Sequence, residues 1–386
     1  MMIVGASVRA AAQSAAAAGL EITAIDLFGD FDLAMHVRHH LIASGPSEFE
    51  RFSARFPATD WIYTGALENQ PRVIEGISRH HTLLGNDPQV IQRVRDPFEL
   101  HGQATEAGFR LPSVAHRSPF DSDGDWLRKP FRSASGNRIS PLIRSSQRPP
   151  PSEDTAQFYY QRRVRGQSIS LTGLACRNPP GGILLGCTEQ LVGCSWCAAG
   201  AFSYCGSVGP FPLREPALSH ARDLIHWLAV EFHLVGLFGV DAILNKAGFW
   251  ILEVNPRFSA SAEIVEKTSG VNAIQCHINA CRDQPADYPE CRQDASRQYG
   301  KAILFAQRDT ELKPSAVHWL QANRQGADGE LQFADIPSRP QQVIQGHPVM
   351  TVLAEGTSRQ EVIDQLKARL AMWEDQVTRS SDSKSG

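Results

Sequence analysis

The sequence predicts a protein of mixed α/β class (α+β), in which a parallel-sheet unit is followed by antiparallel sheets. Three observations lead to this prediction: a strand, helix and strand open the chain, short segments rich in β-forming residues fill its middle, and a hairpin follows. At 386 residues the chain exceeds what one hydrophobic core usually supports, so several packed units are expected.

The first unit is expected over residues 1–112. Its opening pattern of a buried strand, a helix and a second strand is typical of parallel sheets and falls at 3–7, 9–18 and 21–26. A further strand at 61–63 leads into a polar loop, where Glu68 and Asn69 would lie at the carboxyl edge of the sheet. Such edges bind ligands, so both residues are substrate-site candidates.

In the middle of the chain the pattern changes from parallel-sheet units to a helical stretch followed by short β-rich segments. A helical pattern runs from 88 to 114 with a stop at Gly108, and Pro112 marks the passage into the second unit. Three short β-rich segments then predict one antiparallel sheet, at 125–131, 157–164 and 168–174. Residues 144–154 are expected to form a mobile surface loop.

Beyond residue 216 the pattern predicts a helix, a hairpin and a β-rich end. The hairpin strands are 238–244 and 249–254, and 299–353 reads as strands and turns. A helix is expected at 358–373. The resulting units are 113–275 for the central domain, 276–375 for the C-terminal β-rich part and 376–386 for a disordered polar tail.

Composition excludes several classes of function. A net charge of -3, with 42% hydrophobic and 20% charged residues, argues against a nucleic-acid-binding surface. No apolar run approaches the roughly 18 to 20 residues of a membrane span, and the N-terminus lacks a signal-peptide pattern, so a cytoplasmic location without membrane contact is expected. The eight cysteines fit reduced thiols. A zinc site is the disfavoured alternative for Cys187, Cys194, Cys197 and Cys205, because only one pair is closely spaced.

The strongest chemical signal is the run Glu253-Val254-Asn255-Pro256-Arg257 at the end of the hairpin. Glu253 and Asn255 are two apart on a strand, so their side chains share a face, which Asp241 can reach from the partner strand. These oxygen ligands suit Mg²⁺ bound to ATP, and Mn²⁺ can take its place. Arg257 would then address a phosphate oxygen or developing negative charge.

With these motifs the sequence resembles the ATP-grasp superfamily, which implies an ATP-grasp fold with a Rossmann-like N-terminal domain. By this resemblance Lys129 would contact the α- and β-phosphates, and Ser133, Ser135 and Gly136 would belong to the loop that closes over them. The adenine would lie at a hinge formed by Gln161, Arg162, Arg163 and Val164, held mainly by the main chain near Gln161 and Val164. Ser168 and Leu252 are the remaining implied nucleotide contacts. Arg257 and Lys129 are the implied catalytic residues.

Two departures from the family pattern stand out. The phosphate loop lacks the family's paired glycines, and an upstream nucleotide-contacting lysine has no counterpart, although Arg95 stands where it could substitute. Over nearly its whole length the chain resembles the predicted ATP-dependent carboligases related to biotin carboxylase, through segments at 3–9, 63–65, 67–69, 84–86, 95–97, 206–210 and 346–352. That group implies a link to methanopterin-type one-carbon cofactor synthesis.

The function predicted is an ATP- and Mg²⁺-dependent ligase that activates a small carboxylate as an acyl phosphate and joins it to an amine. Residues 5–9 and 65–69, with Arg and Ser residues after Arg257, would line the acceptor site. Two alternatives stay open: a carboxylation like that of biotin carboxylase, and a non-catalytic ATP-binding regulator. The identity of both substrates and the oligomeric state are left open, although relatives of this kind are often dimers, which makes a homodimer a candidate.

Overall fold

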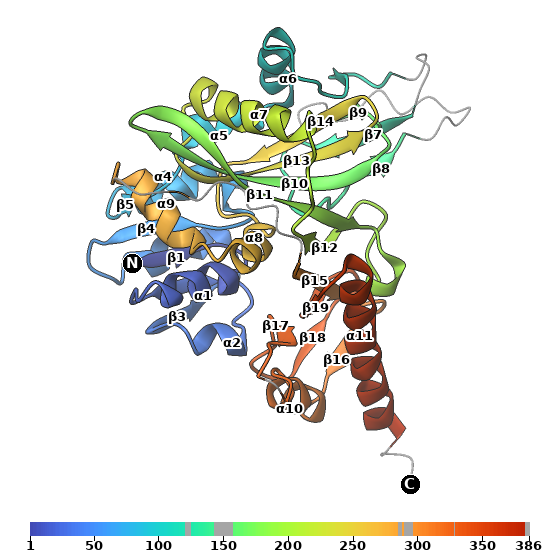
Figure 1. Ribbon diagram of the computed structural model, residues 1–386. Helices are drawn as coiled ribbons and strands as arrows, with labels where there is room; N and C mark the ends of the chain where they lie inside the picture. The colour runs from blue at the N-terminus through green and yellow to red at the C-terminus, as the bar shows by residue number, and fades with distance from the viewer. Residues whose placement is uncertain (120–124, 143–156, 285–287, 289–295, 328, 383–386) are drawn as a thin grey trace.

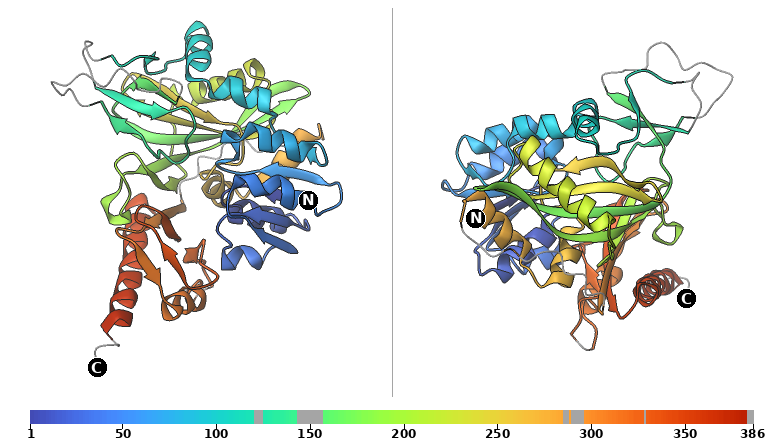
Figure 2. Two further views of the ribbon diagram at one scale, coloured as in Figure 1. Left: turned by 180° about the vertical axis from the view of Figure 1, so that it is seen from behind. Right: turned by 45° about the horizontal axis from the view of Figure 1, so that its top comes forward.

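The computed structural model describes residues 1–119, 125–142, 157–284, 288, 296–327 and 329–382. Figures 1 and 2 show three parts in space: an N-terminal α/β layer, a large antiparallel sheet beside it, and a C-terminal lobe carrying a long final helix. The mobile loop predicted at 144–154 lies outside the described residues.

The N-terminal part is a five-stranded parallel sheet with strand order β3-β2-β1-β4-β5, as the opening pattern predicts. The strands are β1 (Met2–Val4), β2 (Thr23–Asp26), β3 (His39–Ile42), β4 (Asp60–Tyr63) and β5 (Thr82–Leu83). The helical elements among them are α1 (Arg9–Ala17), α2 (Phe31–Ala34), η1 (Pro46–Glu48), α3 (Phe49–Ser53), η2 (Leu67–Asn69) and α4 (Pro71–Ser78).

The helical pattern predicted over 88–114 is divided into two helices, α5 (Pro88–Arg95) and α6 (Pro97–Glu106). The division falls at Asp96, whose side chain accepts hydrogen bonds from the backbone N–H groups of Phe98 and Glu99 and so begins a new helix. Pro97 reinforces the break, because it disfavours helical backbone at the residue before it. Arg95 is thereby the last residue of α5, and its NH2 donates to Asn69 Oδ1 at 3.3 Å.

A second sheet has eight strands in the order β14-β13-β10-β11-β12-β15-β19-β17. Its strands are β10 (Gln167–Arg177), β11 (Pro180–Val192), β12 (Tyr204–Gly209), β13 (Gly236–Asn245), β14 (Gly248–Asn255), β15 (Gln298–Phe305), β17 (Phe333–Ala334) and β19 (Pro348–Gly356). Helices α7 (Ala217–Glu231), α8 (Ala262–Ser269) and α9 (Ala273–Cys281) and the turn η3 (Ser195–Cys197) complete this part. The hairpin predicted at 238–254 is confirmed as β13 and β14, which pair antiparallel.

The single antiparallel sheet predicted for three middle segments is wrong in one respect. Strands β6 (Val114–Ala115), β7 (Trp126–Pro130), β8 (Ser140–Pro141) and β9 (Phe158–Arg162) form a separate sheet in the order β6-β9-β7-β8, whereas the segment at 168–174 lies within β10 of the large sheet. The chain changes sheet between Arg162 and Gln167, across Gly166 with its positive φ of 159°. A β-carbon there would meet the Leu244 carbonyl oxygen at 2.5 Å, so glycine permits the close approach.

The C-terminal part departs from its prediction twice. The stretch read as strands and turns contains β16 (Thr310–Leu312) and β18 (Gln341–Val343), but also a helix, α10 (Pro314–Ala322). Its apolar side chains Ala316, Val317 and Leu320 recur at helical spacing and are buried, a period that the strand interpretation overlooked. The tail predicted as disordered from 376 is helical as far as Asp382, because α11 (Arg359–Asp382) continues and Val377 packs against the C-terminal core.

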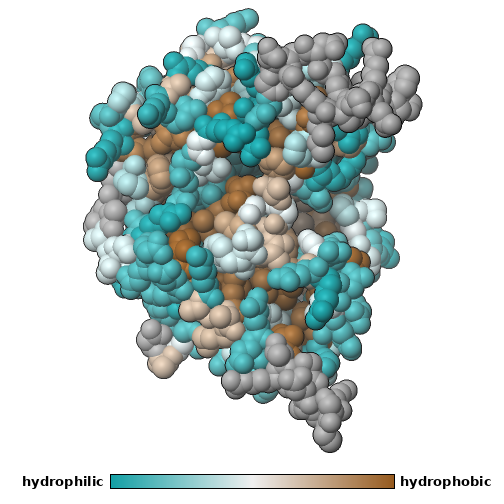
Figure 3. Space-filling view, turned by 90° about the vertical axis from the view of Figure 1, so that its right-hand side faces the viewer, coloured by the Kyte–Doolittle hydropathy of each residue, from teal (hydrophilic) through white to brown (hydrophobic). Residues whose placement is uncertain are grey.

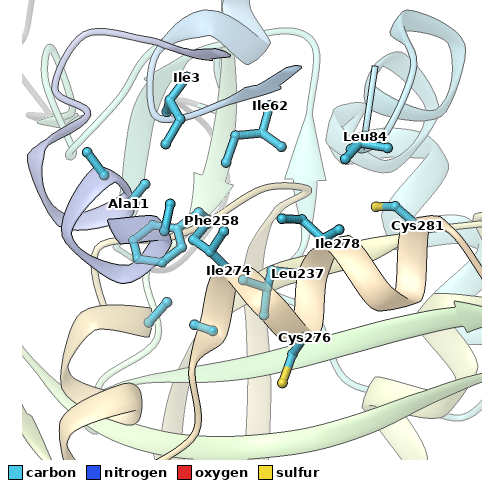
Figure 4. Close-up of a cluster of buried hydrophobic side chains, with 14 of the residues drawn as sticks. Ile3, Ala11, Ile62, Leu84, Leu237, Phe258, Ile274, Cys276, Ile278 and Cys281 are labelled. Atoms are coloured by element: carbon cyan, nitrogen blue, oxygen red, sulfur yellow. The ribbon is translucent and has the colours of Figure 1, made fainter. Parts of the chain in front are cut away.

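The core that joins the N-terminal layer to the large sheet positions the site. Figure 4 shows Ile3 and Ala11 from the first unit facing Phe258, Ile274 and Leu237. Phe258 follows directly after the Glu253 to Arg257 run, so this packing fixes the loop that carries Arg257. On one face of the molecule hydrophobic side chains also gather in a hollow between the upper and lower parts (Figure 3).

Two further features bear on the predictions. In the described part of the chain no helix is long and apolar enough to span a membrane. The cysteines described there are free, among them Cys187, Cys194, Cys197 and Cys205, and no cluster of three or more His, Cys, Asp or Glu side chains in the same residues could hold a metal ion.

Candidate functional site

The β13–β14 hairpin brings the predicted metal ligands together. Asp241 pairs with Glu253 across the two strands, and Gly239 pairs with Asn255. The strands are joined by a tight turn in which the Asn245 side chain accepts from the Ala247 N–H and Gly248 has a φ of 108°. A bulge after Asp241 alters the register there. The three side chains therefore share one face, as the two-residue spacing predicts.

Hydrogen bonds orient the two carboxylates. Asp241 Oδ1 accepts from Ser170 Oγ at 3.0 Å and from Gln190 Nε2 at 2.8 Å. Asn255 Nδ2 donates to Asp241 Oδ2 at 3.1 Å and to Glu253 Oε1 at 3.3 Å. Ser170 and Gln190 lie on β10 and β11, so the neighbouring strands hold the acidic hairpin in place.

The electrostatics of the pair favour a bound cation. Burial, and then repulsion by Glu253, raise the pKa of Asp241 to about 7. Burial also acts on Glu253, but the charges of Lys129 and Arg95 outweigh it and hold the pKa of Glu253 below its usual range. A proton shared by the pair therefore resides on Asp241. A divalent cation would relieve the same repulsion, and two carboxylates with an amide oxygen form a donor set that suits Mg²⁺ or Mn²⁺.

Lys129 reaches the site from the smaller sheet. It is buried on β7, and its Nζ donates to Gln161 Oε1 at 3.0 Å. Gln161 lies on β9 between β6 and β7, paired with Val114 on one side and Leu127 on the other. The main chain of Gln161 is thus enclosed by the sheet, so its side chain is the part that serves the site.

The loop predicted to cover the phosphates is ordered by contacts with three other segments. The Ser133 carbonyl oxygen accepts from Asn69 Nδ2 at 3.2 Å and from Arg95 NH2 at 3.3 Å, and the Ser135 carbonyl accepts from the Tyr204 N–H at 3.1 Å. Gly136 has a φ of 74°, and a β-carbon there would lie 1.9 Å from the Phe202 carbonyl oxygen. One glycine therefore serves where paired glycines were expected.

A cavity of about 490 Å³ lies between the two sheets, and every residue predicted to bind the nucleotide or the metal or to act in catalysis lines it. We call it the nucleotide cavity. Its predicted members are Lys129, Ser133, Ser135, Gly136, Gln161, Arg162, Arg163, Val164, Ser168, Asp241, Leu252, Glu253, Asn255 and Arg257. The structure thus assembles in one place residues that are spread over 129 positions, from 129 to 257.

Arg257 is held by partners from two parts of the chain. Its NH2 donates to Glu68 Oε1 at 2.7 Å and to Asn255 Oδ1 at 3.2 Å. The same oxygen of Glu68, which is fully buried, lies 3.0 Å from Arg95 NH1. The two guanidinium groups outweigh burial and keep the pKa of Glu68 low. Glu68 therefore serves as a fixed counter-charge that orients Arg257 and Arg95, whereas the sequence indicated a substrate contact.

A second cavity of about 420 Å³ adjoins the first, and we call it the acceptor cavity. Ser135, Tyr204, Arg257 and Ser259 line both. The second cavity is also lined by residues 6, 7 and 9 and by residues 64–66 of the N-terminal part, which belong in part to the segments 5–9 and 65–69 expected at the acceptor site. Lys301, Met350 and other residues of the C-terminal part close it.

Sequence reasoning missed several residues of these walls. Ser170, Gln190 and Tyr204 contact predicted residues, but they belong to strands whose alternation signals only a sheet. Asp30, Lys301 and Asp335 line the acceptor cavity from segments outside the recognised motifs. Only the fold brings them to the site, so no local pattern could have identified them.

Comparison with known proteins supports the resemblance. The family model for the ATP-grasp domain matches residues 94–261. The carbamoyl phosphate synthase large chain of Rhodopirellula baltica is 37% identical over 68 residues, a match that covers 17% of this chain and only 6% of that protein. An uncharacterized protein of Methanocaldococcus jannaschii is 20% identical over 302 residues, covering 76% of this chain and 69% of the other.

Solved structures show the fold. The biotin carboxylase domain of Hydrogenobacter thermophilus 2-oxoglutarate carboxylase, crystallised with MgADP, ADP and bicarbonate, has a TM-score of 0.69 at 12% identity and covers 95% of this chain and 89% of that one. An ADP complex of N5-carboxyaminoimidazole ribonucleotide synthetase also has a TM-score of 0.69, at 15% identity over 97% of each chain. The predicted fold is thereby confirmed.

Proposed function

Since residues 94–261 are an ATP-grasp domain, we propose that the protein is an ATP- and Mg²⁺-dependent ligase that activates a small carboxylate and joins it to an amine. The observation that carries the proposal is the pair of adjoining cavities. One holds the acidic hairpin and Lys129, the other is open to a second molecule, and Arg257 lines both. A group activated in the first cavity can therefore meet an acceptor in the second.

The residues divide the work as follows. Lys129 would neutralise phosphate oxygens, and Asp241, Glu253 and Asn255 would hold Mg²⁺, which supplies charge neutralisation at the phosphates. A carboxylate oxygen of the substrate attacks the γ-phosphorus, and the bond to the ADP oxygen breaks. The amine nitrogen then attacks the acyl carbon, phosphate leaves, and the amine proton passes to solvent. Arg257, already oriented by Glu68, would stabilise the charge that develops at the shared wall.

For the nucleotide base we propose the segment from Arg162 to Val164. The N–H groups of Arg162 and Arg163 donate to Ser113 and Asp125 carbonyls within the smaller sheet. Of the positions expected to bond adenine through the main chain, Val164 is therefore the better candidate, and Gln161 would act through its side chain.

The test is phosphate release from ATP with Mg²⁺ and pooled amino acids, other carboxylates and amines. Wild type should show release that depends on the added substrates, and Glu253→Gln should lose it by at least ~100-fold, since a metal ligand is removed. The matched control is Glu75→Gln, an exposed position on α4, which should behave as wild type. Binding of ATP without release from any pool would instead favour a non-catalytic regulator.

Carboxylation is a second candidate, because biotin carboxylase domains are among the proteins that share the fold. In that reaction bicarbonate takes the place of the carboxylate. Carboxylation would be supported if phosphate release required bicarbonate and if labelled carbon from bicarbonate appeared in the acceptor. The link to methanopterin-type cofactor synthesis rests on resemblance alone, and assays with such cofactor precursors would test it.

A further inference from the structure

In the described residues, the acceptor cavity is lined by an acidic side chain with an oxygen that has no hydrogen-bond partner. Asp30 lines the cavity, is 5% exposed, and its Oδ2 has no hydrogen-bond partner in the described residues. It lies at the start of α2, after the carboxyl end of β2, and forms an isolated backbone bridge with Pro337 of the C-terminal part. The position of Asp30 is therefore fixed by its backbone, and among the described residues its Oδ2 is left unpaired.

Every cation lining the same cavity is already paired. Arg9 Nε lies 2.9 Å from Asp335 Oδ1, Arg257 NH2 lies 2.7 Å from Glu68 Oε1, and Lys301 Nζ lies 2.8 Å from Glu263 Oε2. Each of these groups is therefore bonded to a carboxylate other than that of Asp30. An anionic acceptor would have to compete with those carboxylates, whereas a cationic one finds an unpaired partner.

The surroundings of Asp30 add negative charge. Burial, and then Asp335, Asp32 and Asp26, raise the pKa of Asp30 well above its usual range, against a smaller opposing effect of Arg9. Asp32 is used structurally, because it accepts from the backbone N–H groups of Asp335 and Ile336. Asp30 Oδ2 makes no such bond to any described residue. A buried carboxyl kept without a partner costs stability, which is typical of a group retained for binding.

We infer that Asp30 is the recognition site for a positively charged group of the acceptor, so that the second substrate is a cationic amine with an apolar body. The apolar body is indicated by Phe28, Phe258, Ile303, Val349 and Met350, which line the same cavity. Phe28 is 42% exposed although it is a large aromatic side chain. The inference deepens the proposed ligase function and rests on it for the role of acceptor, but the binding site stands on the contacts above.

The experiment measures direct binding to the full chain by ligand-observed NMR, with three probes of equal length: n-hexylamine, hexan-1-ol and hexanoate. Wild type should bind hexylamine most tightly. Asp30→Asn should weaken hexylamine by about tenfold, because a charge-assisted hydrogen bond is lost, and should leave hexanol unchanged. Asp223→Asn removes the same charge from an exposed position on α7 and should change nothing.

The outcomes are separable from those of the proposed function. Binding of ADP with Mg²⁺, measured on the same samples, should be equal in all three proteins. Loss of ADP binding or of phosphate release, with the hexylamine preference intact, would remove the ligase function and leave the cation site standing. Equal binding of hexylamine and hexanol, tightest binding of hexanoate, no detectable hexylamine binding, or an Asp30→Asn variant that binds hexylamine like wild type would each overturn the inference. Asp30→Ala repeats the test should Asp30→Asn fail to fold.

Discussion

The two adjoining cavities treat buried charge in opposite ways. In the nucleotide cavity Asp241 accepts from three side chains, and Lys129 is bonded to Gln161. In the acceptor cavity the cations are paired, while Asp30 Oδ2 has no partner among the described residues. In the first cavity the charged side chains are therefore held in position by protein partners before a ligand binds. The second leaves one acidic side chain without a partner for its ligand to contact. The comparison teaches that the specificity of a cavity can be sought in the polar groups that the protein leaves unpaired.

The largest effect is expected where paired charge supports the acceptor cavity. Arg9 is buried and bonded to Glu263 and Asp335, so Arg9→Met would leave Glu263 with Lys301 as its remaining cation and Asp335 without its guanidinium partner, and should lower the free energy of unfolding by roughly 3–5 kcal/mol. Denaturant unfolding measures it. Arg38→Met, which breaks an exposed pair with Glu21, is the control and should cost no more than about 1 kcal/mol. Similar losses of unfolding free energy in both variants would show that burial does not increase the contribution of an ion pair to stability.

The same variant should change the dependence of stability on pH. Burial opposes ionisation of Glu263, but Arg9 and Lys301 outweigh it and hold the pKa of Glu263 far below its usual range. A carboxyl with a lowered folded pKa adds stability above its unfolded pKa of about 4.3, and that stability is lost as the pH falls toward the folded pKa. Arg9→Met should therefore lose less stability than wild type on acidification. An equal acid-side slope in both proteins would contradict this assignment.

Next in size is the removal of one carboxylate from the nucleotide cavity. Asp241→Asn should raise the Mg²⁺ concentration needed for ADP binding by roughly 10- to 100-fold. Without Mg²⁺ the variant should be at least as stable as wild type, because repulsion between Asp241 and Glu253 is removed. Titration calorimetry and thermal unfolding measure the two effects. A fall in stability without Mg²⁺ would mean that the hydrogen bonds of Asp241 outweigh the repulsion.

A smaller effect is expected on ADP affinity, and it should differ between substitutions at the two buried lysines. Lys129→Met should weaken ADP binding by about tenfold, since it removes a cation from the phosphate end of the cavity. Lys301→Met is the matched control, because Lys301 is equally buried but is bonded to Glu263 beside the acceptor cavity. It should lower stability and leave ADP affinity unchanged. Equal loss of ADP binding in both variants would contradict the assignment of the nucleotide to the first cavity alone.

The contrast also explains what could be predicted from the sequence. The residues that line the nucleotide cavity all fall between 127 and 261, so the two-residue spacing of Glu253 and Asn255 and the order of the motifs could indicate it. The acceptor cavity combines Arg9, Asp30, Lys301 and Asp335 from opposite ends of the chain, and their proximity depends on how the parts pack. Local pattern could also not show that Glu68 faces Arg257, because that contact spans 189 positions.

The smallest effect tests the unpaired charge itself. Since the folded pKa of Asp30 is raised above its unfolded value of about 3.9, its contribution to stability becomes unfavourable as the pH rises through that interval. Asp30→Asn should therefore be more stable than wild type, by on the order of 1 kcal/mol at about pH 8 and by less at about pH 5. Thermal unfolding at the two values measures the gain. A variant that is less stable at the higher pH would show that Asp30 is a structural residue with a partner, and a cationic acceptor would lose its main support.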